Sequence, residues 1–497
     1  MTSPIEQQAD RPESFPLERF DEWFDDRVRR HRFRIDPIPF DELRQWEFAP
    51  TTGNLVHASG KFFSIEGLSV ETNWGSIRQW NQPIINQPEI GYLGMLAKSI
   101  GGVLHFLMQA KMEPGNIRCI QLAPTLQATK SNYTRVHHGK TPLYLDLFRN
   151  RRRDQVLVDS LQSEQGSRFL RKRNRNMVIL LDEQQDVPPH PDFLWLTLRQ
   201  IRELLRRDNV INMDARTVLA CLPESATGNR SSADGLSYPA TADPAASSSA
   251  HAGGCDEVDP GDLAKILAWV TELKCDFELR AERIPLRRAE PWEITKDRIA
   301  HPSGDHFEVI AVRVEADNRE VTSWTQPILK PCHEGLVAFV TRERHGRTEL
   351  LVQAKVEAGN FDVIELAPTI QCLSADYRSA EVSRRYPFAD YVLAARPEQK
   401  LHDTRQSEEG GRFFREENRN MVVRADADFP HDLPRHFSWV PYRLLKSLLM
   451  HSNIVNVQAR CLLNAVPSNA VPLNAVPLNA VPLNAAPACR AGSGVAR

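Results

Sequence analysis

One block of the chain is repeated almost unchanged, and this repetition restricts the possible folds more than any other feature of the sequence. Residues 109–116 (QAKMEPGN) recur as residues 353–360 (QAKVEAGN), a displacement of 244 positions. The same displacement relates LAPTLQ to LAPTIQ and WNQPI to WTQPI, which begin at Leu122, Leu366, Trp80 and Trp324. A displacement shared by three separate blocks indicates a tandem duplication of a whole domain.

The duplication predicts two homologous domains with a linker between them. The segment between the repeats is rich in Ser, Ala, Gly and Pro, and the chain ends in a pentapeptide repeat with a regularly spaced proline. Neither segment has the apolar surface that would offset the entropy of ordering. We expect a disordered N-terminus (1–14), a first repeat (15–222), a flexible linker (223–258), a second repeat (259–463) and a low-complexity disordered tail (464–497).

The charge and hydropathy of the chain exclude several classes of partner. Lys and Arg number 62 and Asp and Glu number 64, giving a formal charge of −2. This balance lacks the basic excess with which nucleic-acid binders contact phosphates, so no nucleic acid is expected. No apolar run approaches the roughly 20 residues that cross a bilayer, and residues 1–16 are polar, unlike a signal peptide. We therefore expect a cytoplasmic protein without a membrane partner.

Within each repeat the residue pattern predicts an α+β domain. Apolar residues at three- and four-residue spacing predict an opening helix near residues 17–28 and 263–273. Runs of β-branched and aromatic residues predict strands, at 62–71, 103–112, 307–315 and 350–356. The last third of each repeat is predicted to be helical, at 167–173, 198–206, 412–417 and 442–450. Each repeat should be a mixed sheet packed against flanking helices.

The QAKxE motif closes an apolar run, so it should lie where a strand ends. Side chains two positions apart share a face of a strand, which brings Lys111 next to Glu113 and Lys355 next to Glu357. An ammonium and a carboxylate so placed shift each other's pKa and suit an acid, a base or a substrate clamp. The alternative is a solvated strand face that carries ordinary ion pairs.

A second duplicated motif, QSEQGSRF from Gln162 and QSEEGGRF from Gln406, precedes the segments predicted to be helical. Backbone amides at a helix N-terminus form an anion site, and Arg168 or Arg412 would bind a phosphate through two N–H groups. The alternative is ordinary helix capping by Ser163 or its counterpart.

The third motif places Trp80 and Trp324 beside a glutamine and a proline, which suits either stacking on a nucleobase or half-buried packing. The sequence contains no G-x-G-x-x-G after a strand, no P-loop, no G-x-S-x-G and no metal-ligand spacing. We therefore expect no cofactor and no metal.

Together the QAKxExGN, LAPT[LI]Q, QSE[QE]GxRF and WxQPI blocks resemble the NDP-hexose 2,3-dehydratases of antibiotic deoxysugar pathways. The resemblance extends from about residue 15 to 220 and from 260 to 462. It implies a tandem pair of Nudix-like mixed-sheet domains, a homodimer and a dTDP-4-keto-6-deoxyhexose substrate. The Glu-rich metal helix of a Nudix box is missing from both repeats, which argues against metal-dependent pyrophosphate hydrolysis.

The reaction implied by the resemblance is an elimination of water. A ketone at C4 acidifies the C3 proton, a base removes this proton, and the C2 hydroxyl leaves with help from an acid. The enol product becomes a 3,4-diketo-2,6-dideoxy sugar without a redox cofactor. Because this diketone is unstable, an NAD(P)H-dependent 3-ketoreductase is expected to act on it.

The resemblance also suggests roles for the duplicated residues, with the tryptophans against thymine and the QSE motifs around pyrophosphate. The catalytic candidates are Lys111, Glu113, Tyr133, Lys355, Glu357 and Tyr377. The substrate-binding candidates are Trp80, Gln82, Ser163, Glu164, Gln165, Gly166, Arg168, Trp324, Gln326, Arg405, Gln406, Ser407, Gly410, Gly411 and Arg412.

One set of catalytic candidates is expected to be active. The second set is slightly favoured, because Asp376 and Glu409 add carboxylates where the first repeat has Asn132 and Gln165. Two other classes of function remain open: a nucleotide-sugar binding protein without activity, and a duplicated scaffold whose motifs only preserve the fold.

Overall fold

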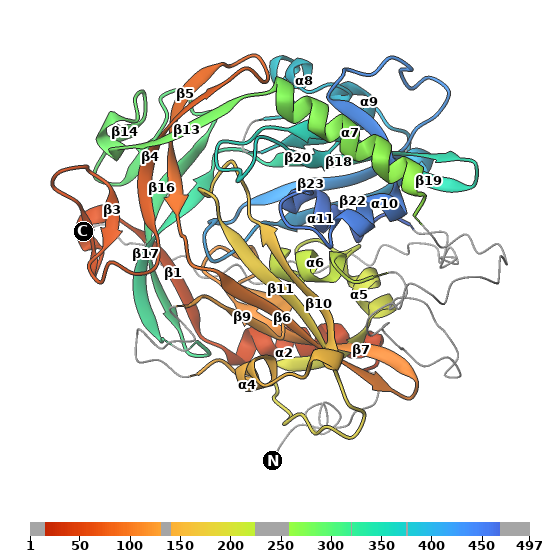
Figure 1. The fold of residues 1–497 in the computed structure, drawn as a ribbon. Helices are drawn as coiled ribbons and strands as arrows, with labels where there is room; N and C mark the ends of the chain where they lie inside the picture. The colour runs from red at the N-terminus through yellow and green to blue at the C-terminus, as the bar shows by residue number, and fades with distance from the viewer. Residues whose placement is uncertain (1–14, 131–140, 224–257, 320, 374–375, 468–497) are drawn as a thin grey trace.

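The computed structural model describes residues 15–130, 141–223, 258–319, 321–373 and 376–467. The predicted N-terminal segment, most of the predicted linker and tail, and Tyr133 lie outside these residues. The two repeats are coloured red to yellow and green to blue in Figure 1, and each combines strands with helices. The α+β prediction with a repeated domain is confirmed. No helix in the described ranges is long and apolar enough to span a membrane.

The first repeat contains strands and helices in mixed order. Its strands are β1 (Phe33–Ile38), β2 (Trp46–Phe48), β3 (Leu55–His57), β4 (Ser64–Thr72), β5 (Gln79–Asn86), β6 (Gly91–Ile100), β7 (Val103–Met112), β8 (Ile120–Pro124), β9 (Leu126–Ala128), β10 (Val156–Ser163), β11 (Arg173–Leu181) and β12 (Phe193–Thr197). Its α-helices are α2 (Phe20–Arg30), α4 (Leu145–Arg149), α5 (Leu198–Leu204) and α6 (Met213–Ala220).

The second repeat follows the same plan. Its strands are β13 (Leu279–Ile284), β14 (Glu293–Ile294), β15 (Arg298–Ala300), β16 (Phe307–Ala316), β17 (Ser323–Pro331), β18 (Gly335–Arg344), β19 (Arg347–Lys355), β20 (Glu365–Pro368), β21 (Ile370–Cys372), β22 (Lys400–Ser407), β23 (Glu417–Arg424) and β24 (Phe437–Pro441). Its α-helices are α7 (Pro260–Asp276), α8 (Ala380–Arg385), α9 (Ala389–Leu393), α10 (Tyr442–Leu448) and α11 (Val457–Leu463).

Each repeat builds one large mixed sheet, which has seven strands in the described part of the chain. In the first repeat the strand order is β10-β11-β6-β7-β12, with β6 and β11 parallel and the other neighbours antiparallel. The second repeat reproduces this order with β22, β23, β18, β19 and β24. In both sheets the strand that ends in the QAKxE motif is close to the sheet centre, which fixes the motif firmly.

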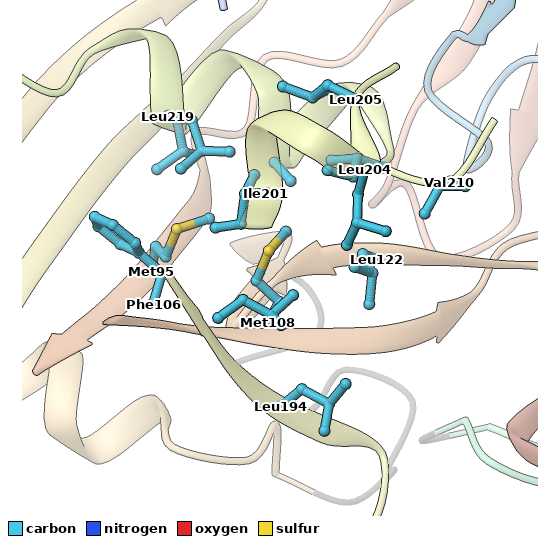
Figure 2. Packing of buried hydrophobic residues seen from close by; sticks show 14 of the residues in the cluster. Met95, Phe106, Met108, Leu122, Leu194, Ile201, Leu204, Leu205, Val210 and Leu219 are labelled. Atoms are coloured by element: carbon cyan, nitrogen blue, oxygen red, sulfur yellow. The ribbon is translucent and has the colours of Figure 1, made fainter. Parts of the chain in front are cut away.

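Helices α5 and α6 cover one face of the first large sheet. Alternate residues of β7, among them Phe106 and Met108, point toward these helices and are almost fully buried. Figure 2 shows Ile201 and Leu204 of α5 packed over Met108 and its neighbours. Burial of such side chains contributes roughly 1.5–3 kcal/mol each, so this layer fixes the sheet against its helices.

The first main strands of the two repeats are exchanged. Strand β1 leaves its own repeat and pairs antiparallel with β16, with Phe33 opposite Ala316. Strand β13 pairs in the same way with β4 of the first repeat, with Leu279 opposite Thr72. Each smaller sheet therefore contains strands from both repeats (Figure 1). The two smaller sheets share a core, which includes Trp46, Trp292, Phe169 and Phe413.

The prediction of helices at 167–173 and 412–417 is wrong, because both segments belong to the loops of β-hairpins. Strand β10 pairs antiparallel with β11, so that Ser163 faces Arg173 and the loop 164–172 joins them. Within the loop, the Leu170 amide donates to the Ile85 carbonyl at 2.9 Å, and the Ile85 amide donates to Arg168. These backbone groups pair with a neighbouring strand, so they cannot form helical hydrogen bonds. The hairpin joining β22 and β23 repeats the pattern through Leu329.

The GN turn of the QAKxExGN motif binds the hairpin of the opposite repeat. The Gly115 amide donates to the Gly410 carbonyl at 2.7 Å, and the Gly359 amide donates to Gly166 at 2.6 Å. A Cβ atom at Gly115 would overlap the carbonyl oxygen of Phe413. The QAKxExGN motif of each repeat thus contacts the QSE motif of the other repeat, which explains why both motifs are present in both repeats.

Replacing Gly115 by alanine is therefore expected to destabilise the fold by about 1–3 kcal/mol or more, because two backbones must separate. The control is Gly261→Ala in α7, where a Cβ would meet a single oxygen of the Asp259 side chain at 3.1 Å. Denaturant unfolding measures both changes. Equal stability of the two variants would contradict the close backbone contact.

Candidate active site

A cavity of about 470 Å³ lies between the two repeats. The first repeat contributes the motif residues Lys111 and Glu113 to its wall. The second repeat contributes residues of its WxQPI and QSE motifs, namely Trp324, Gln326, Glu409, Gly411 and Arg412. The candidate residues therefore combine across the repeats instead of within one repeat, as a direct result of the crossed hairpins.

Lys111 and Glu113 form a buried pair at the end of β7, with 6% and 3% of their surface exposed. The Lys111 ammonium donates to the Gln127 carbonyl at 3.0 Å. Glu113 Oε1 accepts from the Gln127 side chain at 2.7 Å, and Oε2 accepts from Asn212 at 3.4 Å. Two amide donors on one carboxylate match the acceptor-only pattern of an ionised acid. This burial rules out the alternative of a solvated strand face.

Two more carboxyl groups, which the sequence analysis did not single out as site residues, line the same cavity. Asp214, in the first turn of α6, is 2% exposed, and its Oδ1 has no hydrogen-bond partner in the described ranges. Burial raises the pKa of Asp214 well above its ordinary value, and the charges of Glu409 and Glu113 raise it further. Burial also raises the pKa of Glu409, to about 8, and Glu164 adds to this effect.

The lining of the cavity also contains basic and aromatic side chains. The guanidinium of Arg412 lies 4.2 Å from the centre of the Phe63 ring, and burial lowers the pKa of Arg412. Trp324 is half-buried, and its indole N–H donates to Gln326 at 2.8 Å. The Gln326 amide in turn donates to the Gly411 carbonyl at 2.9 Å. Three further arginines line the wall: Arg44, Arg313 and Arg319.

The counterpart residues of the second repeat have different surroundings. Lys355 and Glu357 repeat the contacts of the first pair, through the Gln371 carbonyl at 3.1 Å and the Gln371 side chain at 3.0 Å. However, the Lys355 ammonium lies 5.7 Å from the ring centre of Trp74 and 6.0 Å from that of Tyr386. Burial lowers the pKa of Lys355 and raises that of Glu357.

The residues around Lys111 and Glu113 and those around Lys355 and Glu357 also differ in their carboxyl groups. The counterparts of Asp214 and Glu409 are the amides Gln458 and Gln165, and the counterpart of Gly411 is Ser167. A carboxyl facing an amide at the same aligned position had already drawn attention to Glu409, and the same comparison of Asp214 with Gln458 would have found the second acid.

Comparison with known proteins decides the family. A family model described as NDP-hexose 2,3-dehydratase matches the chain at residues 17–222 and again at 263–466. The chain belongs to this family. It is 47% identical over 455 residues to the dTDP-4-dehydro-6-deoxy-alpha-D-glucopyranose 2,3-dehydratase of Saccharopolyspora spinosa, which covers 91% of this chain and 92% of the relative. Proteins of the same name from Streptomyces violaceoruber and Amycolatopsis orientalis are 46% and 42% identical, over 90% and 89% of this chain and 96% and 88% of the relatives.

The prediction of a sugar 2,3-dehydratase, a hydro-lyase, is thus confirmed, and an inactive binding protein is not favoured. The part of this dehydratase that the structure describes contains no group of three His, Cys, Asp or Glu side chains that would hold a metal ion.

Several candidates predicted from the sequence hold the repeats of the dehydratase together. The Ser163 hydroxyl donates to Glu365 at 2.6 Å, and the Ser407 hydroxyl donates to Gln121 at 2.8 Å. Neither serine caps a helix, so the expected anion site at a helix N-terminus is wrong. Gln406 donates to the Leu205 carbonyl at 3.1 Å. These contacts join residues of different repeats.

Other predicted candidates do not line this cavity, or they lie near the counterpart pair Lys355 and Glu357. Arg405 is exposed and pairs with Glu334 at 2.7 Å, and the hydroxyl of Tyr377 donates to the same carboxylate at 3.1 Å. Trp80 donates to Gln82 at 2.8 Å and packs against the core of the first smaller sheet. Arg168 lies 4.3 Å from the ring centre of Phe307.

Proposed function

We propose that this chain removes water from a dTDP-4-keto-6-deoxyhexose in the cavity between its two repeats. The observation that carries the proposal is the composition of the cavity wall. A buried lysine and carboxylate from one repeat face an arginine and a tryptophan from the other. The named relatives act on a dTDP-4-dehydro-6-deoxy sugar, whose charged nucleotide and neutral ketose match these two halves.

The acidic half of the cavity suits the chemistry at the sugar. Glu113 takes the proton from C3, because its carboxylate is held by two amide donors and faces the cavity. The electrons of the C3–H bond then form an enolate with C4 and its oxygen. The Lys111 ammonium stabilises the negative charge on that oxygen, and its buried position strengthens this effect.

The basic half suits the nucleotide. Arg412 presents a planar guanidinium that matches a pyrophosphate oxygen pair, and Arg44, Arg313 and Arg319 add positive charge to the lining of the cavity. Trp324 offers a ring on which thymine stacks. These residues position the sugar against the carboxylates.

The test is incubation of the purified chain with dTDP-4-keto-6-deoxyglucose and an NADPH-dependent 3-ketoreductase. Mass analysis should find a product that has lost one water and gained two hydrogens. Recovery of the unchanged sugar, or its reduction without loss of water, would contradict the proposal.

Trp324→Ala is expected to weaken binding of dTDP by about 1–3 kcal/mol, because a stacked base loses its aromatic platform. Trp80→Ala is the matched control, since Trp80 makes the same hydrogen bond to the counterpart glutamine but packs on Leu68 and Val70. Titration calorimetry measures the affinity and the number of sites. Equal losses in both variants would indicate two nucleotide sites, and no loss in either would contradict the stacking role.

Three further features belong to the proposal. The repeats are Nudix-like domains, a fold that combines a mixed sheet with flanking helices, as each half of this molecule does. The chain forms a homodimer. An NAD(P)H-dependent 3-ketoreductase consumes the diketone, because that product is too reactive to accumulate.

A further inference from the structure

The two QSE hairpins present equivalent residues to each other. In one contact, the side-chain amide of Gln165 donates to Oε2 of Glu408. The other oxygen of Glu408 accepts from Asn418. Both oxygens of this buried carboxylate therefore have donors, as a buried anion requires.

In the equivalent contact a carboxyl group replaces the donor. Glu164 stands in place of Glu408, and Glu409 stands in place of Gln165. Oε1 of Glu164 accepts from Asn174 at 2.8 Å, but Oε2 is buried and has no hydrogen-bond partner among the described residues. Glu409 supplies a donor at this position only as a protonated acid, because an ionised carboxylate has none. A proton on Glu409 would therefore supply the donor that Oε2 of Glu164 lacks.

Glu409 is the member of this pair that reaches the substrate cavity. Glu164 is 4% exposed, whereas Glu409 lines the cavity and is half-buried. A Cβ atom at Gly411 would lie 3.3 Å from Oε1 of Glu409 and 3.6 Å from Oε1 of Glu113. The two carboxyl groups therefore flank the same glycine, which leaves room for a sugar carbon between them.

We infer that Glu409 is the general acid of the reaction and gives the leaving C2 oxygen the proton that it offers to Glu164. The inference rests on the proposed elimination and supplies its acid. Glu113 gains the C3 proton, the enolate electrons form the C2–C3 double bond, and the C2–O bond breaks. The oxygen leaves as water with the proton of Glu409, which becomes a carboxylate. Exchange with solvent returns one proton from Glu113 to Glu409.

The electrostatic surroundings agree with this role. Burial raises the pKa of Glu409 to about 8, and the negative charges of Glu164 and Glu113 add to the shift, while Arg412 and Lys172 oppose it. Burial also raises the pKa of Glu164. Glu409 therefore keeps its proton at neutral pH and loses it as the pH rises through about 8. Asp214 shares the cavity and senses the same charges.

The test uses the Glu409→Gln variant of the full-length chain, which should fold because Gln165 occupies the equivalent position. Dehydration of dTDP-4-keto-6-deoxyglucose should fall by about 10² to 10⁴. Exchange of the C3 hydrogen with deuterated solvent should stay within about threefold of wild type, because Glu113 is intact. Loss of fluoride from the 2-deoxy-2-fluoro analogue should also persist, because fluoride leaves without a proton.

Glu365→Gln is the matched control. Glu365 is also a buried carboxyl group, and it accepts a hydrogen bond from Ser163. Burial raises the pKa of Glu365 to about 7. Its counterpart in the first repeat is the amide Gln121. Its dehydration rate should match wild type. In wild type, the rate should fall above about pH 8 with the hydroxyl substrate and not with the fluoro analogue.

Three outcomes would overturn the inference. They are normal dehydration by Glu409→Gln, a parallel loss of C3 exchange, and failure of the fluoro analogue to rescue the variant. If wild type itself eliminates neither water nor fluoride, the proposed function fails and the inference fails with it. A wild type that eliminates both, beside an unimpaired variant, refutes the inference alone.

Discussion

Glu113→Gln is expected to slow dehydration by about 10² to 10⁴ while leaving the affinity for dTDP within about twofold. Glutamine keeps the size of the side chain and the contact with Gln127, but it cannot accept the C3 proton. The substitution leaves Arg412 and Trp324, which are proposed to hold the nucleotide, unchanged, so ground-state binding should survive. Single-turnover rates and dTDP calorimetry separate the two effects.

The matched variant is Glu357→Gln in the second repeat. It makes the same change at the counterpart position, where Lys355 faces Trp74 and Tyr386 and the aligned acids are amides. Its dehydration rate should remain within about threefold of wild type. Equal losses in both variants, or a large loss only in Glu357→Gln, would contradict a single active centre built on Lys111 and Glu113.

The preference of the sequence analysis for the second set of residues rested on two extra carboxylates. One of them, Glu409, belongs to the second repeat but lines the cavity that contains Glu113 of the first repeat. The other, Asp376, accepts from the amide of Arg378 at 3.1 Å and does not line this cavity. The premise that each repeat supplies its own acids is wrong, because the hairpins cross between the repeats.

The sequence predicted the elements whose residue pattern is set by burial. Helices α2, α5, α7 and α10 lie where periodicity predicted them, because one face of each packs against a core. Strands β4, β7, β16 and β19 lie where runs of β-branched and aromatic residues predicted them, because such residues suit the buried faces of a sheet. The pairing of Lys111 with Glu113 was also predictable, since spacing along one strand determines it. Local pattern was enough wherever neighbours in sequence are neighbours in space.

Contacts between the repeats could not be predicted in this way. The segment from Ser167 to Arg173 has a composition that suits a helix, and only the pairing of its backbone with Ile85 makes it a hairpin loop. Likewise, nothing within β1 specifies that it pairs with β16 instead of its own repeat. Asp214 was missed, and Glu409 was assigned to the wrong set of residues, for the same reason: both line the cavity with Glu113 only after the chain has folded as one unit.

Because each repeat gives its first strand to a sheet of the other repeat, neither half of the chain should fold alone. A first half ending at residue 240 lacks β13, which pairs with β4 from Gly67 to Thr72. A second half starting at residue 241 lacks β1, the partner of β16. Each would expose an unpaired strand edge and half of the core around Trp46 and Trp292. We expect each half to be insoluble or unfolded when expressed alone, with dehydratase activity below about 1% of wild type.

Co-expression of the two halves should restore a soluble complex and most of the activity, because the exchanged strands need no covalent connection between the repeats. The control is the intact chain with a protease site inserted between residues 224 and 257 and cut after folding. It should elute as one species and keep the activity of the uncut protein. A half that is soluble, monomeric and cooperatively folded alone would show that the exchange is dispensable, and the cavity would then have to form by docking of two independent domains. Activity restored only in the co-expressed pair would tie catalysis to the interface, since Glu113 and Glu409 line one cavity from different halves of the chain.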